Sequence, residues 1–211
     1  MSKINKLLVD TAYFPNIEIF ALIKNSEQVI FEQFENYQKQ SFRNRCSILS
    51  ANGVLNLTIP VAKEASPKVL IKNIRIAYDM PWQRQHLRAI HAAYKSSPFY
   101  DFYIDDIKPF FERHFDFLFD FNTKIIYEIC QLIGIETNFS LTSEYKHFGE
   151  NEIVDAREWF HPKKENPQKI FTENYRQVFD NKFGFTENLS ILDLLFNEGP
   201  NSIKILSTKK P

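Results

Sequence analysis

The sequence predicts an α/β protein: an N-terminal βαβ unit and a β-hairpin in a mixed sheet, followed by a mostly helical half. Three observations indicate this fold class. Two short apolar runs flank a capped helical pattern within residues 7–34, an Asn52-Gly53 turn separates two further strand-like runs, and the apolar period becomes helical after Pro81.

The first apolar run, residues 7–14, is a predicted strand that Pro15 interrupts. Asn16 is placed to cap a helix that starts at Ile17, and residues 28–34 have the pattern of a second strand. A strand, a helix and a strand in such close succession form a βαβ unit, which normally pairs its strands in parallel through a right-handed crossover.

A hairpin is predicted over residues 42–61. Its centre is Asn52-Gly53, a pair that supplies the positive φ angles a tight turn needs. After a polar loop, residues 69–78 alternate apolar and polar side chains closely enough to predict another strand.

The second half is predicted to be mostly helical. Residues 82–94 repeat apolar side chains with a helical period, and Ser97 is placed as the N-cap of a following helix. Helical structure is expected to continue after Asp106. Residues 122–133 carry the clearest amphipathic pattern, and Gly134 stands where a glycine commonly ends a helix.

The polar stretch that follows carries prolines and no sustained period, which is typical of a long surface excursion. Beyond it, Asn188 or Ser190 is placed to cap a short apolar helix that Gly199-Pro200 ends. We therefore expect one domain over residues 1–211, made of an α/β portion (1–80), a helical portion (81–143), a polar excursion or lid (144–174) and a C-terminal closing segment (175–211).

The composition restricts the function classes. Lys+Arg and Asp+Glu both number 26, so no overall positive field attracts nucleic acid or an anionic membrane. The 5 glycines are too dispersed for a phosphate-binding glycine loop, and the 2 cysteines lie too far apart in sequence for a zinc cluster. The N-terminus lacks the apolar region of a signal peptide, and no apolar run approaches the ~20 residues of a membrane helix. We expect a cytoplasmic protein without a metal or a cofactor, and the sequence leaves its oligomeric state open.

Three cations, Lys39, Arg43 and Arg45, stand close together in the sequence. On a strand, Arg43 and Arg45 would share one face. Two guanidinium groups on one face need an anion or a carboxylate between them, and the planar fork of arginine suits both phosphate and carboxylate. Two interpretations stay open: an anionic ligand, or ion pairs with protein acids such as Glu32 or Glu35.

Two further side chains are candidates for catalysis. His86 has an unperturbed pKa near neutrality and could act as a general base, although a single histidine more often makes a structural hydrogen bond. Its spacing from His91 turns the two imidazoles apart on a helix, so they do not form a metal site. Asp193 lies in an apolar run, where a carboxylate is buried only with partners. It would then anchor an arginine or orient a histidine; the alternative is a solvent-facing position.

Short motifs spread along the chain form a recognisable set: YFP (13–15), YQK (37–39), RNR (43–45), LTIPV (57–61), Trp82 with HL (86–87), AYKSSPFY (93–100), YRQVF (175–179) and NLSILDLLFNEGP (188–200). With these motifs the sequence resembles the WbqC-like proteins, a family linked to bacterial surface-polysaccharide (O-antigen) biosynthesis. The resemblance covers nearly the whole chain, and the closing motif is its most specific part.

The resemblance implies transfer of an acyl or aminoacyl group, such as glycyl, to a nucleotide-linked amino sugar. His86 and Asp193 are then the expected catalytic residues. The expected substrate-binding residues are Tyr37, Lys39, Arg43, Asn44, Arg45, Trp82, Tyr94, Tyr175 and Gln177. The expected partner is a small molecule that bears phosphate or carboxylate, and neither nucleic acid nor a membrane is expected.

A fainter similarity concerns residues 9–23 and 29–34, which resemble the first βα unit of nucleotidylyltransferases and pantothenate synthetases. Those enzymes carry HxGH where this chain has Pro15-Asn16-Ile17-Glu18. The similarity implies a Rossmann-like or nucleotidylyltransferase-like sheet. Two alternative functions therefore stay open: a non-catalytic ligand-binding or assembly protein of the same pathway, or a nucleotidylyltransferase-like enzyme that binds ATP or CTP near residues 11–16.

Overall fold

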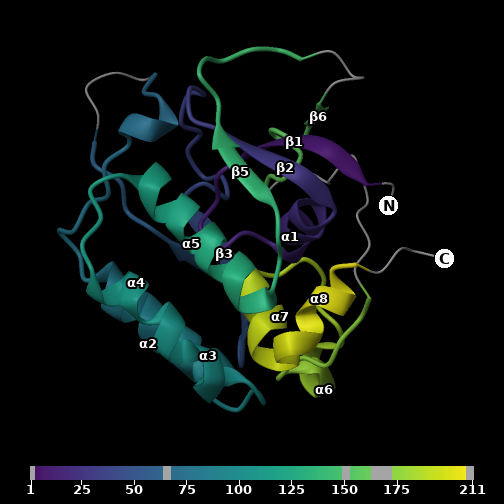
Figure 1. Ribbon diagram of the computed structural model, residues 1–211. Helices are drawn as coiled ribbons and strands as arrows, with labels where there is room; N and C mark the ends of the chain where they lie inside the picture. The colour runs from purple at the N-terminus through teal and green to yellow at the C-terminus, as the bar shows by residue number, and fades with distance from the viewer. Residues whose placement is uncertain (1–2, 64–67, 149–152, 163–172, 208–211) are drawn as a thin grey trace.

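The computed structural model describes residues 3–63, 68–148, 153–162 and 173–207, and it shows an α/β protein (Figure 1). Four parallel strands form the main sheet in the order β5-β2-β1-β6. They are β1 (Ile4–Asp10), β2 (Ser26–Glu32), β5 (Asn138–Leu141) and β6 (Val154–Asp155). The N-terminal residues therefore supply the centre of the sheet, and later parts of the chain supply both edges.

The predicted βαβ unit is confirmed, because α1 (Ile17–Lys24) joins the parallel pair β1 and β2. Asn16 caps α1, and its Oδ1 accepts a hydrogen bond of 3.1 Å from the backbone N–H of Ile19. The first strand ends earlier than its apolar run. Tyr13 and Phe14 lie in the turn after the strand and are completely buried there. Their apolar character therefore reflects burial in the turn and not a continuation of the strand.

The predicted hairpin is also confirmed: β3 (Arg45–Ser50) and β4 (Gly53–Thr58) pair in antiparallel fashion. Gly53 has φ +103° at the turn, the conformation that favours glycine there. The expectation of one mixed sheet is wrong, since the hairpin forms a two-stranded sheet of its own. Outside the hairpin, strand β3 packs against the helices α2 and α7.

The strand predicted over residues 69–78 is wrong. The segment contains a short 3₁₀ helix, η1 (Ile71–Asn73), and isolated bridges to other parts of the chain. Ile71 and Ile74 are both buried, and a spacing of three residues places side chains on one side of a 3₁₀ turn. The apolar pattern does mark buried side chains, but a tight turn buries side chains at this spacing as well as a strand does.

The helical half is confirmed with changed boundaries. Its helices are α2 (Trp82–Tyr94), α3 (Tyr100–Ile107), α4 (Pro109–Glu112) and α5 (Leu118–Ile133). Gly134 ends α5 with φ +79°, as predicted. Ser97 is not the N-cap of α3, because Phe99 takes that position. The helix expected after Asp106 is interrupted beyond α4, where Arg113 has extended backbone.

Neither edge strand of the parallel sheet was predicted. β5 pairs with β2, and β6 pairs with β1 over only two residue pairs. β6 lies inside the polar stretch 144–174, so part of that stretch belongs to the sheet; residues 149–152 and 163–172 lie outside the described residues. Strands of four and two residues are too short to show a period in the sequence.

The closing segment contains α6 (Asp180–Phe183), α7 (Ile191–Glu198), η2 (Gly199–Asn201) and α8 (Ser202–Ile205). Ser190 caps α7, as predicted, and its hydroxyl accepts a hydrogen bond from the N–H of Leu192. The same hydroxyl donates to the carbonyl oxygen of Phe14 at 3.0 Å. Two backbone bonds, Ile17 N–H to Leu189 O and Ile191 N–H to Pro15 O, complete the contact between this segment and the β1–α1 turn.

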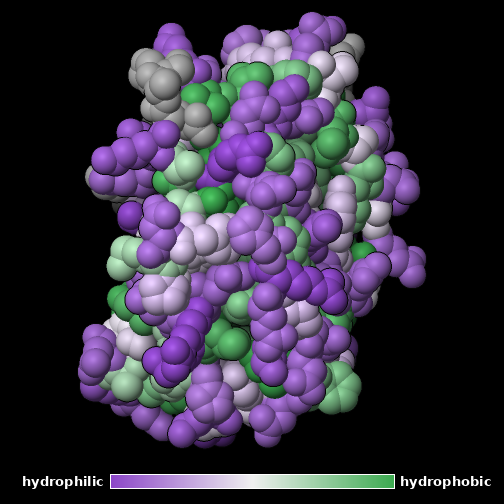
Figure 2. Space-filling model, turned by 90° about the vertical axis from the view of Figure 1, so that its left-hand side faces the viewer, coloured by the Kyte–Doolittle hydropathy of each residue, from purple (hydrophilic) through white to green (hydrophobic). Residues whose placement is uncertain are grey.

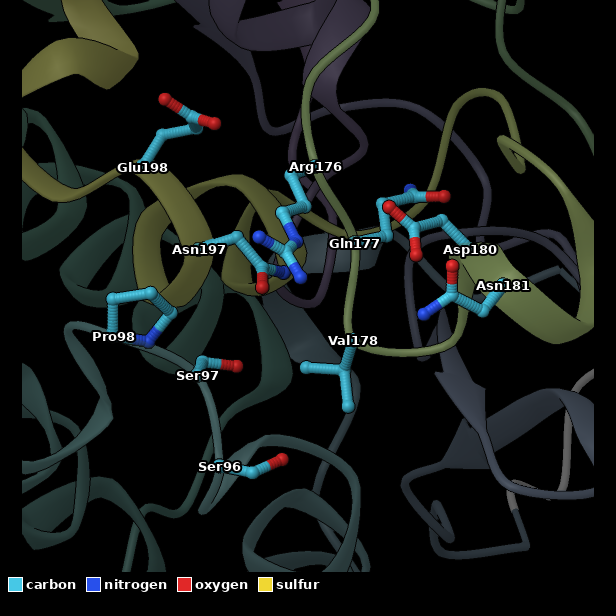
Figure 3. Close-up of a pocket in the computed structure, with 10 residues that line it drawn as sticks. All are labelled: Ser96, Ser97, Pro98, Arg176, Gln177, Val178, Asp180, Asn181, Asn197 and Glu198. Atoms are coloured by element: carbon cyan, nitrogen blue, oxygen red, sulfur yellow. The ribbon is translucent and has the colours of Figure 1, made fainter.

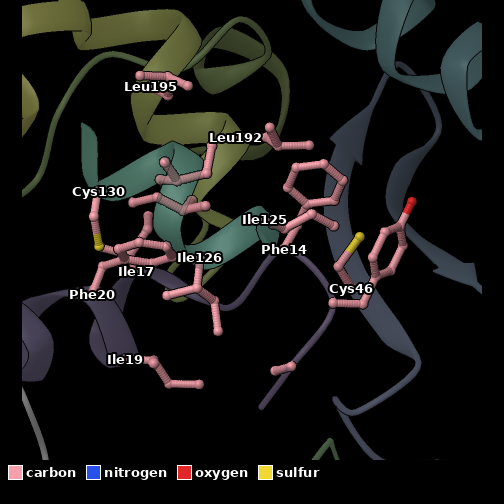
Figure 4. Packing of buried hydrophobic residues seen from close by; sticks show 14 of the residues in the cluster. Phe14, Ile17, Ile19, Phe20, Cys46, Ile125, Ile126, Cys130, Leu192 and Leu195 are labelled. Atoms are coloured by element: carbon pink, nitrogen blue, oxygen red, sulfur yellow. The ribbon is translucent and has the colours of Figure 1, made fainter. Parts of the chain in front are cut away.

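Helices α1, α5 and α7 meet in the main core (Figure 4). Ile17 and Phe20 of α1 lie beside Ile126 and Cys130 of α5. Helix α5 also reaches the sheet, since the ring centroids of Tyr127 and Phe31 lie 6.0 Å apart. One face of the sheet is therefore covered by apolar packing, as the high content of phenylalanine and the helical patterns indicate.

The face shown in Figure 2 is mostly hydrophilic, and its hydrophobic side chains form small separate groups. Among the described residues, none of the helices combines the length and the apolar character needed to span a bilayer.

Candidate functional site

The carboxyl edge of the parallel sheet is where a functional site is expected. In open α/β sheets, ligands bind outside the carboxyl ends of the strands, where the strand order reverses. Here that point lies between β1 and β6, because β1 connects to β2 on its other side. Asp10 ends β1 and Glu32 ends β2, and the alternation along each strand turns both side chains toward the face opposite α1.

A buried arginine joins two carboxyl groups at this edge. Arg43 binds Glu35 through two nitrogens, with Nε 2.6 Å from Oε1 and Nη2 in contact with Oε2. Nη2 also lies 3.0 Å from Oδ2 of Asp10. The side chain of Arg43 is 3% exposed, so this is a charge cluster removed from water. Such a cluster is stable only if its charges are matched.

The Arg43 cluster, which we define as Asp10, Glu35 and Arg43, contains two carboxyl groups with raised pKa values. Burial raises the pKa of Glu35 to about 7, although the hydrogen bonds from Arg43 lower it. Burial likewise raises the pKa of Asp10, and the two carboxyl groups lie in hydrogen-bonding contact. Among the described residues, no donor reaches Oδ1 of Asp10, which is buried. Below about pH 7, one proton bound by the pair makes the cluster neutral.

A small pocket opens beside the Arg43 cluster. It has a volume of about 10 Å³ and is lined by Val9, Asp10, Thr11, Ala12, Ile19, Phe42, Arg43 and Phe160. That volume is roughly one water molecule. The hydroxyl of Thr11 is completely buried and meets no partner within the described ranges. The pocket therefore offers a hydroxyl, a carboxyl and a guanidinium to one water-sized group.

A second arginine covers the edge from the side of β6. Arg157 binds Oε2 of Glu32 at 2.8 Å and both carboxylate oxygens of Asp155, at 2.9 and 2.6 Å. The next residue, Glu158, donates its backbone N–H to Oδ2 of Asp10 at 2.9 Å. The segment after β6 is thus fastened to the ends of both central strands and closes over the pocket.

The backbone is strained around the same edge. Phe14, Gln40 and Glu158 have φ angles of +38°, +59° and +64°, in the region that side chains other than glycine rarely adopt. Each lies in a loop that follows β1, precedes β3 or follows β6. Residues in such conformations tend to cluster at functional sites, which adds weight to this location.

The three cations of the sequence prediction separate in the structure. Arg43 is buried with Glu35, so the ion-pair interpretation is confirmed for this residue. It precedes β3, and the prediction that it shares a strand face with Arg45 is wrong. Arg45 is half-buried and donates to Oγ1 of Thr58 at 3.2 Å, while Lys39 is exposed. Only one of the three therefore belongs to the cluster.

Tyr37 and Asn44 lie near these cations. Tyr37 is half-buried, and burial raises its pKa to about 12, while Arg43 and Arg45 lower it. Its hydroxyl is therefore within electrostatic reach of both guanidinium groups. Asn44 is buried and donates its Nδ2 to the carbonyl of Ile59 at 2.8 Å, which joins the hairpin to the following loop.

His86 and Trp82 form a separate aromatic group. Nδ1 of His86 lies 3.0 Å from the hydroxyl of Tyr13, and the indole of Trp82 packs edge-on against the imidazole. Burial lowers the pKa of His86 to about 4, so the imidazole is neutral at neutral pH. Its base role stays a prediction, and its surroundings are those of a buried structural group.

Asp193 gathers residues that lie far apart in the sequence. Its Oδ2 accepts hydrogen bonds from the hydroxyl of Tyr175 at 2.6 Å and from Nε2 of Gln177 at 2.9 Å. Tyr94 is fully buried beside it. Burial raises the pKa of the Tyr94 hydroxyl most strongly, and the charge of Asp193 raises it further. Four predicted site residues thus form one group, although not with Arg43 or His86. Burial raises the pKa of Asp193 despite these hydrogen bonds.

Sequence reasoning missed Asp10 and Arg157 as site residues, and it included Thr11 only in the range 11–16 of the nucleotidylyltransferase-like alternative. Asp10 and Thr11 did carry a signal, since polar residues directly after an apolar strand mark the carboxyl edge of a sheet. Arg157 carried none, because it lies in a polar stretch without a period. Within the parts of the chain that the structure describes, no three His, Cys, Asp or Glu side chains are arranged to hold a metal ion.

The parallel sheet, the separate hairpin and the buried cluster at the carboxyl edge define an α/β protein with a buried acid pair of raised pKa at the reversal of strand order. The chain belongs to the WbqC-like protein family, whose model matches residues 11–165. This range includes Thr11, Glu35, Arg43 and Arg157. The Asp193 group shares only Tyr94 with it, since its other members lie beyond residue 165.

A relative shows similarity over most of its length. The chain is 25% identical to the uncharacterized protein Rv1507c of Mycobacterium tuberculosis over 219 aligned residues, which cover 91% of this chain and 93% of that protein. No solved structure matches. The finer Rossmann-like or nucleotidylyltransferase-like description of the fold therefore stays a prediction.

Proposed function

We propose that the protein is a transferase of bacterial surface-polysaccharide biosynthesis, which moves an acyl or aminoacyl group to the amino group of a nucleotide-linked amino sugar. Membership of the WbqC-like family supports the pathway. The observation that carries the chemistry is the Asp10–Glu35 pair: both pKa values are raised, and Asp10 lines a water-sized pocket.

In this proposal the carboxyl pair is the general base. As the sugar nitrogen attacks the acyl carbon, a new C–N bond forms and the bond to the donor's leaving group breaks. The nitrogen must lose a proton, and the pair takes it up in its deprotonated form, which is present near and above the Glu35 pKa of about 7. A base with a pKa near neutrality is efficient at physiological pH, and Glu35 has its pKa at about 7.

Neighbouring side chains have supporting roles. Arg43 keeps both carboxyl groups in place, and the hydroxyl of Thr11 hydrogen-bonds the group that enters the pocket. The exposed Lys39 and half-buried Arg45 are available to the phosphates of a nucleotide. His86 and Asp193 act at a distance from the pocket, as supports of the aromatic group and of the closing segment.

A non-catalytic binding function is the second candidate. The pocket holds only one water-sized group, and Arg43 is already neutralised by protein acids. Nucleotidyl transfer has less support, because protein groups occupy the start of α1. The N–H groups of Ile17 and Ile19 already donate to Leu189 O and Asn16 Oδ1, which removes donors that a phosphate would use.

The test incubates the protein with a nucleotide-linked amino sugar and a panel of activated acyl and aminoacyl donors, and follows the addition of one acyl group to the sugar by mass spectrometry. We expect Asp10→Asn to lower the rate by about a hundredfold or more, because the amide cannot accept the proton. The matched control is Asp105→Asn, an exposed carboxylate on α3 that should leave the rate unchanged.

Two results would contradict the transferase. One is a nucleotide-linked amino sugar that raises the melting temperature of the wild type but is recovered unchanged with every donor; this favours the binding function. The other is an Asp10→Asn variant that keeps the wild-type rate, which would remove the proton-accepting role.

A further inference from the structure

A second and larger pocket lies away from the sheet edge, where the start of α3 meets the end of α7 and the segment 176–181 (Figure 3). Its volume is about 430 Å³, within the range of about 300–1000 Å³ that is typical of small-molecule sites. Most of the residues that line it are of polar or charged types; the lining consists of Ser96, Ser97, Pro98, Arg176, Gln177, Val178, Asp180, Asn181, Asn197 and Glu198.

Hydrogen bonds to the protein interior fix the segment that carries Arg176. The flanking residues Tyr175 and Gln177 are buried and both donate to Asp193 of α7. Gln177 also exchanges two hydrogen bonds with the backbone of Thr186, at 3.0 and 2.8 Å. Because alternate side chains of an extended segment point in opposite directions, these anchors turn Arg176 outward into the pocket.

The opposite sides present further planar polar groups. Asn197 donates its Nδ2 to its own helix, at Asp193 O, which leaves its Oδ1 as an acceptor. The side chains of Asp180 and Asn181 point toward the middle from the other wall in Figure 3. Ser97 is buried, and its hydroxyl points into the pocket. This hydroxyl has no hydrogen-bond partner in the part of the chain that the structure describes.

We propose that this pocket binds a saccharide unit through its hydroxyl groups. A guanidinium, a carboxylate and carboxamides are planar groups with paired donors or acceptors, and they match the adjacent hydroxyls of a sugar ring, which donate and accept at the same time. Val178 and Pro98 offer small apolar surfaces to the C–H groups of the ring. Arg176 lines the pocket together with the acids Asp180 and Glu198, so the lining has no excess of positive charge, which favours an uncharged ring over an anion.

This inference names a separate site and does not depend on the chemistry at the Arg43 cluster. It assigns a function to the predicted residues Tyr175 and Asp193, which position the wall that carries Arg176, and to Gln177, which anchors that wall and also lines the pocket. The site would hold a sugar unit of the substrate or of the growing glycan, whichever reaction occurs at the sheet edge.

The test is a titration of ¹⁵N-labelled protein with glucose, galactose and N-acetylglucosamine at millimolar concentrations, with glycine and inorganic phosphate as comparison ligands. We expect at least one sugar to shift the amide resonances of residues 96–98, 176–181 and 197–198. Arg176→Ala and Asn181→Ala should each lower the affinity for that sugar by about tenfold. The control is Arg88→Ala, an exposed arginine of α2 that should not change the binding.

Three outcomes would overturn the proposal: no shift with any sugar, shifts only with phosphate or glycine, or equal weakening by Arg88→Ala. Asp10→Asn separates this proposal from the transferase. It should abolish turnover and leave the sugar-induced shifts unchanged, so either proposal can fail while the other holds.

Discussion

At the scale of single residues, burial decides what each charged group does. Arg43 and Arg45 differ by two positions, yet one is enclosed with two acids and the other donates to a threonine hydroxyl. Removal from water raises the pKa values of the enclosed acids, while the arginine keeps its charge. The Arg43 cluster therefore holds a proton at a pH at which exposed carboxylates hold none.

This proton gives the first prediction. The pKa of Glu35 is raised from 4.5 to about 7 in the folded state, so the folded protein binds the proton more tightly than the unfolded chain. The stability that this provides is complete below pH 4.5 and is lost as the pH rises to about 7. The loss amounts to at most about 1.4 kcal/mol per pH unit for one proton.

Glu35→Gln should remove this dependence, because an amide does not titrate. Urea unfolding measured at several pH values should show that the difference in free energy of unfolding between wild type and variant changes between pH 4.5 and 7. Glu136→Gln, at an exposed position, is the control and should give a constant difference. A constant difference for Glu35→Gln as well would mean that the pair does not hold the proton.

At the scale of the elements, caps and turns set the boundaries. Asn16, Gly53, Gly134 and Ser190 all act where their chemistry predicts. Gly199 adds a constraint that the sequence does not show. It ends α7 with φ +51°, and a Cβ atom placed there would lie 2.5 Å from Cδ1 of Phe99. The turn is therefore glycine both for its backbone conformation and for the close approach of the ring.

Gly199→Ala should consequently cost more than a comparable glycine substitution. We expect a loss of about 2 kcal/mol or more in the free energy of unfolding, from overpacking together with the strained φ. Gly184→Ala is the matched control, because Gly184 has φ +69° with no atom within 4 Å of the added Cβ, and a smaller loss, from backbone strain alone, is expected there. In a Phe99→Ala background the penalty at Gly199 should fall; an unchanged penalty would exclude the ring as its cause.

At the scale of the whole molecule, residues distant in sequence complete the sheet and its edge. β5 and β6 flank the N-terminal βαβ unit, and Leu189 to Ile191 hydrogen-bond to the β1–α1 turn. Arg157 ties the segment after β6 to Glu32, which is completely buried. Removal of one partner from a buried ion pair leaves an uncompensated charge, which is strongly destabilising.

Arg157→Ala should therefore lower the free energy of unfolding by roughly 3–5 kcal/mol, measured by urea unfolding at neutral pH. Lys108→Ala is the comparison, since Lys108 and Glu112 form an exposed ion pair whose loss should cost less than about 1 kcal/mol. Combining Arg157→Ala with Glu32→Gln should recover part of the loss. Similar costs for Arg157→Ala and Lys108→Ala would show that the edge of the sheet is open to water.

By itself, the sequence determined the βαβ unit, the hairpin, the helical half, the caps and the family resemblance. Each depends on neighbouring residues: apolar period, turn chemistry or a contiguous motif. It also selected Tyr94, Tyr175, Gln177 and Asp193, which prove to form one group. It failed for residues 69–78, where one apolar spacing fits both a strand and a 3₁₀ turn.

Only the tertiary structure decided which groups meet and which are removed from water. The short edge strands, the partners of Arg43 and Glu32, and the anchoring of Arg176 all depend on contacts between residues far apart in the chain. Charge and hydrogen bonding act over a few ångströms of space, whereas sequence patterns record only neighbours along the chain. For this reason the local elements were predictable, but the proton-holding pair and the polar pocket were not.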